Sequence, residues 1–168
     1  MTKVMRFGLV AVFVFALTLA AGCPTKHQVA SDVPDGAIDR SLPVLTGEAR
    51  AAAEQVTNAR IYFEYDKFDL KDESKRVLMQ KAELLKRFTQ IRVSIQGHCD
   101  ERGTEEYNLA LGERRARAAQ EFLVFSGVNA GQLEIVSMGK LHPAVQGHSE
   151  KAWSMNRRDE FVVLNPLR

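Results

Sequence analysis

The strongest constraint on the fold is a change of hydrophobic period that begins near residue 60. Short segments in which apolar and polar residues alternate are separated by longer segments whose apolar residues recur every three or four positions. The first pattern predicts strands and the second predicts amphipathic helices. We expect strands over residues 61–66, 91–96, 133–138 and 160–164, a helix that is capped by Asp69 or Asp72 and runs to about residue 88, and a helix over residues 105–126. Strands that alternate with helices need crossover connections, so the sequence predicts one layered α/β domain.

Residues 1–22 have the composition of an export signal. Lys3 and Arg6 precede an apolar run over residues 7–21, which is shorter than the roughly 20 residues needed to span a bilayer. Small residues stand directly before Cys23, an arrangement that resembles the bacterial lipobox, in which the thiol receives a diacylglycerol. We therefore expect lipidation of Cys23. The alternative is an ordinary signal peptide or an uncleaved anchor, with Cys23 incidental.

The segment that follows the cysteine predicts a tether. Residues 24–57 show no alternation and contain Pro24, Pro34 and Pro43 together with two glycines, a composition typical of an extended linker. Residues 48–55 could form a short helix, but nothing in the sequence shows that this helix packs. The expected organisation is a signal peptide at 1–22, a lipidated N-terminus and flexible tether at 23–57, and a folded domain at 58–168.

The charge balance argues against a nucleic-acid partner. The chain has 23 basic and 21 acidic residues, a formal net charge of +2, and Lys3 and Arg6 account for the excess. Loss of the signal would leave a neutral chain without a basic field. Export also leads to an oxidising compartment. With Cys23 acylated, Cys99 has no partner in the chain, so we expect it to be a small buried residue.

A polar loop between the second strand and the second helix is the candidate binding site. Ligand sites in α/β sheets commonly lie at such strand ends. Asp100 lies in this loop and Arg115 about three turns into the helix, where Asn108, Leu111 and Arg115 share one face. If the loop folds back, Asp100 offers a carboxylate to an ammonium group and Arg115 offers a guanidinium to a carboxylate. The alternative is a surface ion pair on a solvated helix face.

The chain resembles the OmpA-like domain family, and most closely the domain of peptidoglycan-associated lipoproteins. The resemblance is carried by YFEYDKFDL at 62–70, GHCDERGTEEYNLALGERRA at 97–116, VSMGK at 136–140, HPAV at 142–145 and AWSMNRR at 152–158. It implies a βαβαββ-type sandwich, in which a mixed four-stranded sheet carries helices on one face. It also implies a pocket for the diaminopimelate residue of peptidoglycan stem peptides.

The resemblance assigns roles to particular residues. Asp100 matches the family's ammonium-binding position and Arg115 its carboxylate-binding position. The resemblance also assigns four further positions of this pocket, which are occupied here by Asp66, Arg102, Thr104 and Leu111. Two residues depart from the pattern, because Cys99 stands where a small Ala or Thr is usual and Glu64 stands where Asp is common.

The implied function is a tether rather than an enzyme. The resemblance implies an outer-membrane lipoprotein of a Tol-Pal-type system, acting in envelope integrity and cell division, with no cofactor and no metal. Its implied partners are peptidoglycan, the outer membrane through the lipid, and the periplasmic propeller protein of the Tol system. Pro24, where an Asp would retain a lipoprotein in the inner membrane, favours the outer membrane. Two alternatives stay open: a lipid-anchored interaction module without wall binding, and a wall peptidase or zinc site that uses Cys99 and nearby histidines.

Overall fold

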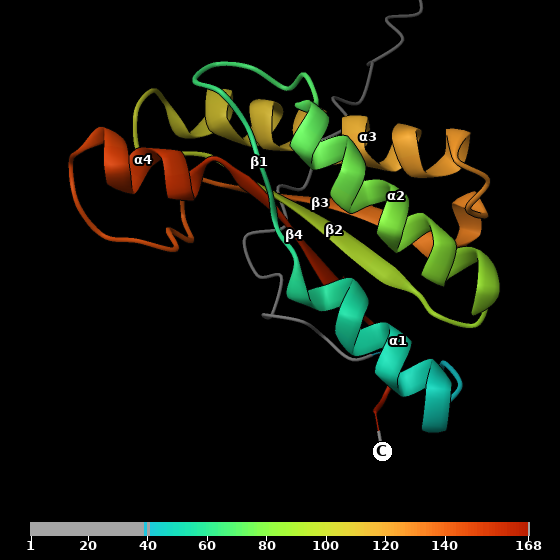
Figure 1. Cartoon of the computed structure of the whole chain (residues 1–168). Coiled ribbons are helices and arrows are strands. Elements are labelled where there is room, and N and C mark those ends of the chain that lie inside the picture. Colours follow the sequence, from blue (N-terminus) through green and yellow to red (C-terminus); the bar gives the residue numbers. More distant parts are fainter. Residues whose placement is uncertain (1–38, 40, 168) are drawn as a thin grey trace, which may run out of the picture. The chain divides into compact units, whose positions relative to one another are not determined.

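The computed structural model describes residue 39 and residues 41–167, in which four α-helices accompany four strands (Figure 1). The elements in chain order are α1 (Gly47–Asn58), β1 (Ile61–Tyr62), α2 (Asp72–Arg87), β2 (Val93–His98), α3 (Glu105–Phe125), a 3-10 turn η1 (Ala130–Gln132), β3 (Leu133–Gly139), α4 (Glu150–Asn156) and β4 (Arg158–Val163). The expected signal peptide and Cys23 lie outside the described residues. Within the described part, no helix combines the length and the apolar character needed to cross a membrane.

The four strands form one mixed sheet in the order β1-β4-β2-β3. Strand β2 runs parallel to β3 and antiparallel to β4, and β1 pairs antiparallel with β4. Ile95 of β2 lies between Ile135 of β3 and Phe161 of β4 in this register. The α/β class and the mixed four-stranded sheet are therefore confirmed.

The hydrophobic core lies between this sheet and the three longer helices. Val93, Ile95 and Phe161 point from the sheet into a cluster with Leu78 of α2 and Leu123 of α3, all fully or almost fully buried. Figure 1 shows α2 and α3 on the same face of the sheet. The prediction of helices packed on one face is confirmed, and the helices expected to run to about residues 88 and 126 end at Arg87 and Phe125. The cap position of α2 is Lys71, not Asp69 or Asp72.

Two glycines bring α3 into backbone contact with the central strand. A Cβ atom added to Gly97 of β2 would lie 2.0 Å from the carbonyl oxygen of Gly112, and one added to Gly112 would lie 2.7 Å from the carbonyl oxygen of Gly97. Only residues without a side chain allow this approach. The contact fixes the height of α3 above the end of β2, and it therefore sets the position of Arg115, one turn further along the helix.

The folded domain begins before residue 58, which corrects the expected boundary of the tether. Residues 48–55 do form a helix, as the sequence allowed, but this helix α1 packs. Its four buried residues join the main core: Ala49, Ala52, Ala53 and Val56. Leu45 is also buried and forms a parallel bridge with Leu167. A stripe of alanines carries little hydrophobic signal, so the sequence pattern alone did not reveal the packed face.

The first strand is shorter than the predicted strand over residues 61–66. The backbone leaves the sheet after Phe63, and Asp66 adopts a left-handed conformation with φ of 58°. The carbonyl groups of Glu64 and Lys67 accept hydrogen bonds from the Arg115 side chain instead of from a neighbouring strand. A side chain distant in sequence thus replaces the strand pairing that the alternation predicted.

Candidate functional site

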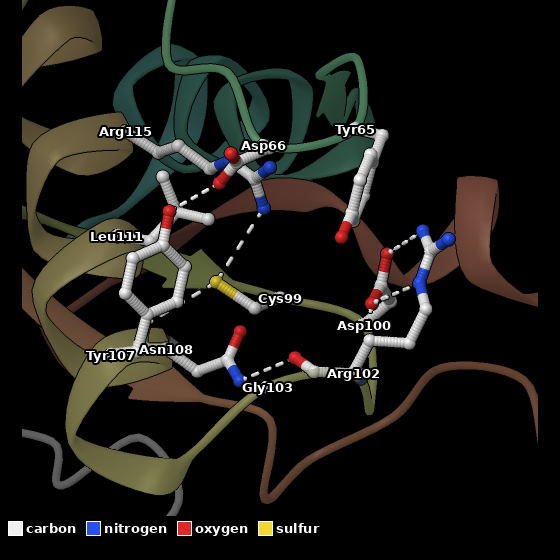
Figure 2. Close-up of a pocket in the computed structure, with 10 residues that line it drawn as sticks. All are labelled: Tyr65, Asp66, Cys99, Asp100, Arg102, Gly103, Tyr107, Asn108, Leu111 and Arg115. Carbon is white, nitrogen blue, oxygen red and sulfur yellow. Dashed lines mark hydrogen bonds and ion pairs between the residues drawn. The ribbon is translucent and has the colours of Figure 1, made fainter.

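A pocket lies where the loops after β1 and β2 meet the first half of α3 (Figure 2). Its lining residues are Tyr65, Asp66, Cys99, Asp100, Arg102, Gly103, Tyr107, Asn108, Leu111 and Arg115. The cavity has a volume of about 50 Å³, which is room for a few heavy atoms. The structure brings Asp100 and Arg115 into one recess, and Asn108 and Leu111 line the same recess.

Asp100 is a buried carboxylate held by two arginines. Arg102 donates from Nε to Oδ1 at 3.0 Å, from Nη2 to Oδ2 at 2.6 Å and from its backbone N–H to Oδ1 at 3.1 Å. Arg157 donates from Nη1 to Oδ2 at 3.2 Å. Burial alone would raise the pKa of Asp100, but the hydrogen bonds from the two arginines outweigh burial and lower the pKa below its usual value. The carboxylate is therefore ionised throughout the physiological range.

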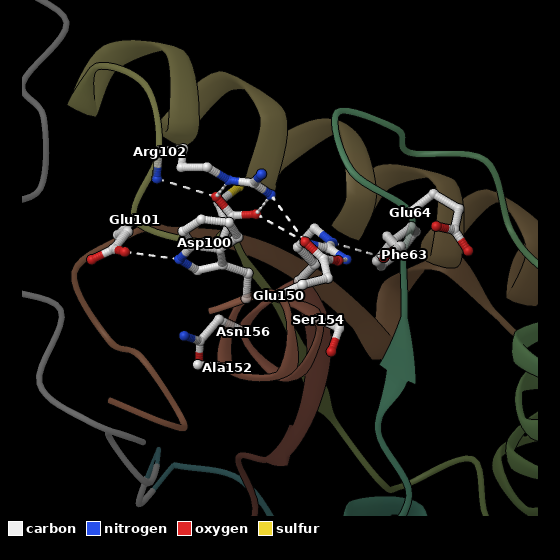
Figure 3. A network of polar contacts seen from close by, with 12 residues as sticks. Phe63, Glu64, Asp100, Glu101, Arg102, Glu150, Ala152, Ser154 and Asn156 are labelled. Carbon is white, nitrogen blue, oxygen red and sulfur yellow. Dashed lines mark hydrogen bonds and ion pairs between the residues drawn. The ribbon is translucent and has the colours of Figure 1, made fainter. Parts of the chain in front are cut away.

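Arg102 is itself held between two aromatic rings. Its guanidinium carbon lies 3.9 Å from the ring centre of Tyr65 and 4.1 Å from that of Trp153, distances at which a cation is attracted to the ring face. Figure 3 shows this arginine beside Asp100 and Glu150 in one network of polar contacts. Hydrogen bonding to Asp100 raises the pKa of Arg102.

Arg115 carries a buried positive charge with no carboxylate in contact among the described residues. The side chain is 1% exposed. It donates to three carbonyl oxygens, those of Lys67 at 2.9 Å, His98 at 2.8 Å and Glu64 at 3.2 Å. A fourth contact joins Nη1 to the sulfur of Cys99 at 3.5 Å. Burial lowers the pKa of Arg115, yet a guanidinium stays charged in proteins. The surface ion pair between Asp100 and Arg115, considered as an alternative, is not formed.

Some of the other predicted residues line the pocket, and others hold its loop in place. Leu111 forms an apolar wall, and Asp66 accepts a hydrogen bond from the Tyr107 hydroxyl across the pocket mouth. Thr104 does not line the cavity. It caps α3, where its side-chain oxygen accepts from the Tyr107 backbone N–H at 3.2 Å. Asn108 fastens the loop to the helix by donating to the carbonyls of Arg102 and Thr104, each at 2.8 Å.

Cys99 is buried, as predicted, and its side chain is a protonated thiol at neutral pH. The thiol lies 3.3 Å from the carbonyl oxygen of Asn108, and burial raises its pKa to about 11. The ring of His98 lines a depression with Gln96 and Arg158, residues that alternate onto the opposite face of the sheet. A protonated thiol and a histidine on opposite faces do not make the nucleophile and base that a cysteine peptidase needs.

Sequence reasoning missed Arg157, Tyr65 and Trp153. Arg157 ends the short helix α4, which showed no apolar stripe and was not expected. It donates hydrogen bonds to Asp100, to Glu150 and to the carbonyl of Phe63. Its only signal was its place in the AWSMNRR stretch that carries part of the family resemblance.

Comparison with known proteins gives a consistent family. The model of the OmpA family matches residues 62–157. A protein of Pseudomonas aeruginosa named peptidoglycan-associated lipoprotein is 43% identical over 95% of this chain and 98% of its own length. A protein of the same name from Brucella melitensis is 34% identical over 93% of this chain and 91% of its own length.

Solved structures agree with the fold. The crystal structure of the peptidoglycan-associated lipoprotein from Burkholderia pseudomallei superposes with a TM-score of 0.63 at 42% identity, covering 65% of this chain and 92% of that one. The C-terminal domain of Helicobacter pylori MotB, at 20% identity, superposes with a TM-score of 0.58 over 62% of this chain and 83% of its own. At this identity, the similarity to the MotB domain supports the fold alone.

Proposed function

Since this chain belongs to the OmpA family, we propose that it is a peptidoglycan-associated envelope lipoprotein whose pocket binds the diaminopimelate residue of stem peptides without catalysis. The observation that carries the proposal is the pairing, in one recess, of an ionised Asp100 with an Arg115 that contacts no carboxylate in the described part of the chain. The end of the diaminopimelate side chain bears an ammonium and a carboxylate on one carbon. One group of each sign in the pocket is the complement of such a zwitterion.

The free donor of Arg115 gives the ligand carboxylate a specific place. A guanidinium has five N–H groups, and the four contacts of Arg115 use Nε, both hydrogens of Nη1 and one hydrogen of Nη2. The second hydrogen of Nη2 has no acceptor among the described residues. A ligand carboxylate at this nitrogen would form a charge-assisted hydrogen bond in a site shielded from water.

The ammonium must compete with arginine for Asp100. Four donors already occupy the carboxylate, three from Arg102 and one from Arg157, and a carboxylate offers about four lone-pair sites. An ammonium can therefore bind Asp100 only if a donor withdraws. The side chain of Arg102 is 29% exposed whereas that of Arg157 is 4% exposed, so we expect Arg102 to yield. This exchange limits the affinity for one stem peptide, and repeated sites on the wall restore it through avidity.

The same proposal includes the anchor and a protein partner. We propose acylation of Cys23, placement of the lipid in the outer membrane, and binding of the Tol propeller protein at the rim of the pocket. The rim suits a protein partner because Tyr65 and Tyr107 are 56% and 48% exposed, and aromatic residues are enriched at interfaces. The variant Cys23→Ser tests the anchor, since it should yield either a soluble periplasmic protein or an unprocessed precursor. Membrane retention of a processed Cys23→Ser protein would contradict acylation.

Co-sedimentation with purified diaminopimelate-type peptidoglycan tests the pocket. The wild-type domain should pellet with the wall, and Asp100→Asn and Arg115→Met should stay in the supernatant while remaining folded by circular dichroism. Arg117→Met is a matched control, because Arg117 lies on the same helix but pairs with Glu113 in solvent. Equal pelleting of all four proteins would contradict the site, and pelleting of none would contradict wall binding.

A further inference from the structure

A carboxyl group without a partner lies beneath the pocket. Asp159, the second residue of β4, is 0% exposed. Neither of its carboxyl oxygens has a hydrogen-bond partner among the described residues. An ionised carboxylate in such a place costs several kcal/mol unless it is paired. Asp159 does not line the pocket that contains Asp100 and Arg115. A direct contact with a ligand therefore does not explain why this carboxyl group is buried.

The register of the sheet places Asp159 on the side that faces the helices. Asp159 pairs with Gly97 of β2 and with Ile61 of β1, at the end of the sheet nearest the pocket. Side chains alternate along β4, so Asp159 lies on the same face as Phe161, which points into the core. The backbone of Gly97 touches α3 at Gly112. Asp159 therefore lies below the turn of α3 that carries Arg115.

Most charged groups around Asp159 have a partner of their own. Arg157 pairs with Asp100 and Glu150, and Arg158 pairs with Glu160. The loop after β2 contributes Asp100, which the arginines compensate, and the Cys99 thiol, which is protonated. Among the described residues of α3, Arg115 acts on Asp159, and Arg115 contacts no carboxylate in this part of the chain. Burial raises the pKa of Asp159 well above its usual value, and Arg115 and Arg158 oppose this rise without cancelling it.

We propose that Asp159 is a positioning residue that stays protonated in the resting protein and so leaves the charge of Arg115 available to the carboxylate of the ligand. Ionised Asp159 would act as an internal competitor, because a second negative charge beside Arg115 would offset the attraction that the pocket exerts on the ligand. Proton binding at Asp159 and carboxylate binding at Arg115 are then linked, and the linkage acts equally in both directions. This inference rests on the proposed binding of diaminopimelate.

The experiment uses Asp159→Asn, which has nearly the same shape and cannot ionise. Infrared difference spectra between wild type and Asp159→Asn at pH 7 should show the carbonyl stretch of a protonated carboxylic acid in the wild type. Calorimetric titration with a diaminopimelate stem peptide should give equal affinities for the two proteins at pH 6. As the pH rises, the wild type should lose about fivefold or more of its affinity relative to Asp159→Asn, at the pH where the infrared band disappears. Titration of the ligand's own ammonium affects both proteins alike and cancels.

Several outcomes separate this inference from the proposed function. Absence of the carboxylic acid band at pH 7, or loss of the band without a change in relative affinity, would overturn the role of Asp159 while leaving wall binding intact. Failure of both proteins to bind the peptide at pH 6 would overturn the proposed function, and the infrared band would still report the protonation state. Asp159→Leu is a second neutral variant, and it should match Asp159→Asn in its pH profile if the charge rather than the shape is responsible.

Discussion

The burial of Lys81 leads to a quantitative prediction about how the free energy of unfolding depends on pH. Lys81 of α2 is 2% exposed. Its ammonium donates to the carbonyl of Val56 near the end of α1 and lies 4.3 Å from the ring centre of Phe161. Burial lowers its pKa from 10.5 to about 8. Each unit of pKa corresponds to about 1.36 kcal/mol, so the charged form destabilises the folded state by about 3 kcal/mol relative to the neutral form.

The sign of the pH dependence follows from the protons bound in each state. Between pH 8 and 10.5 the unfolded chain holds the Lys81 proton and the folded chain has released it, so the free energy of unfolding rises with pH. Cys99 acts in the opposite direction, because its pKa is raised from 9.0 to about 11 and the unfolded chain loses its proton first. The two effects overlap in the wild type, so a variant is needed to separate them.

Urea denaturation of wild type and Lys81→Met at pH 7 and pH 10.5 isolates the lysine. At pH 7 the two should have similar stabilities, because Met removes the burial cost of the charge but leaves the Val56 carbonyl without its donor, at about 1–3 kcal/mol. At pH 10.5 the wild type should be more stable than the variant by about 3 kcal/mol beyond the difference at pH 7. A difference that does not change with pH would refute the reasoning and show that Lys81 stays charged.

Two substitutions and one thiol-reactivity measurement test the packing around the pocket. Gly97→Ala should cost about 3 kcal/mol in urea denaturation, since its Cβ would meet backbone at 2.0 Å, whereas Gly131→Ala, with its nearest contact a side chain at 3.2 Å, should cost far less. Arg157→Met should cost about 3 kcal/mol because it breaks a buried pair, while the exposed Arg117→Met should stay within about 0.5 kcal/mol, and equal effects would contradict the burial argument. Cys99 in the folded protein should react with a thiol reagent about 100-fold more slowly than in urea, and a fast reaction would contradict its raised pKa.

Much of the fold could be predicted because local pattern and final structure agree. The two long helices and the strands β2, β3 and β4 follow from periodicity, since each has one face in the core. Helix α1 was underestimated because alanines carry little hydrophobic contrast. Strand β1 was overestimated because its continuation is decided by Arg115, a residue about 50 positions away whose hydrogen bonds no local rule contains.

The sequence likewise predicted some residues of the pocket and missed others. Asp100, Leu111 and Arg115 could be named because a loop before a helix has calculable geometry and the family resemblance marks the positions. The sequence did not reveal that Arg102 and Arg157, rather than a ligand, occupy Asp100 in this structure. The sequence also did not show that Asp159 is buried, because a run of charged residues such as Arg157–Glu160 is typical of a solvent-exposed segment. Only the register of the sheet shows which residue of this run faces the core.

The most direct test of the account is calorimetric titration of the protein with two stem peptides that differ in one residue, one with diaminopimelate and one with lysine. Lysine lacks the carboxylate proposed to bind Arg115, and loss of one charge-assisted hydrogen bond is worth about 1.5–3 kcal/mol. The diaminopimelate peptide should bind about 10- to 100-fold more tightly than the lysine peptide. Equal affinity for the two peptides would contradict the proposed contact with Arg115.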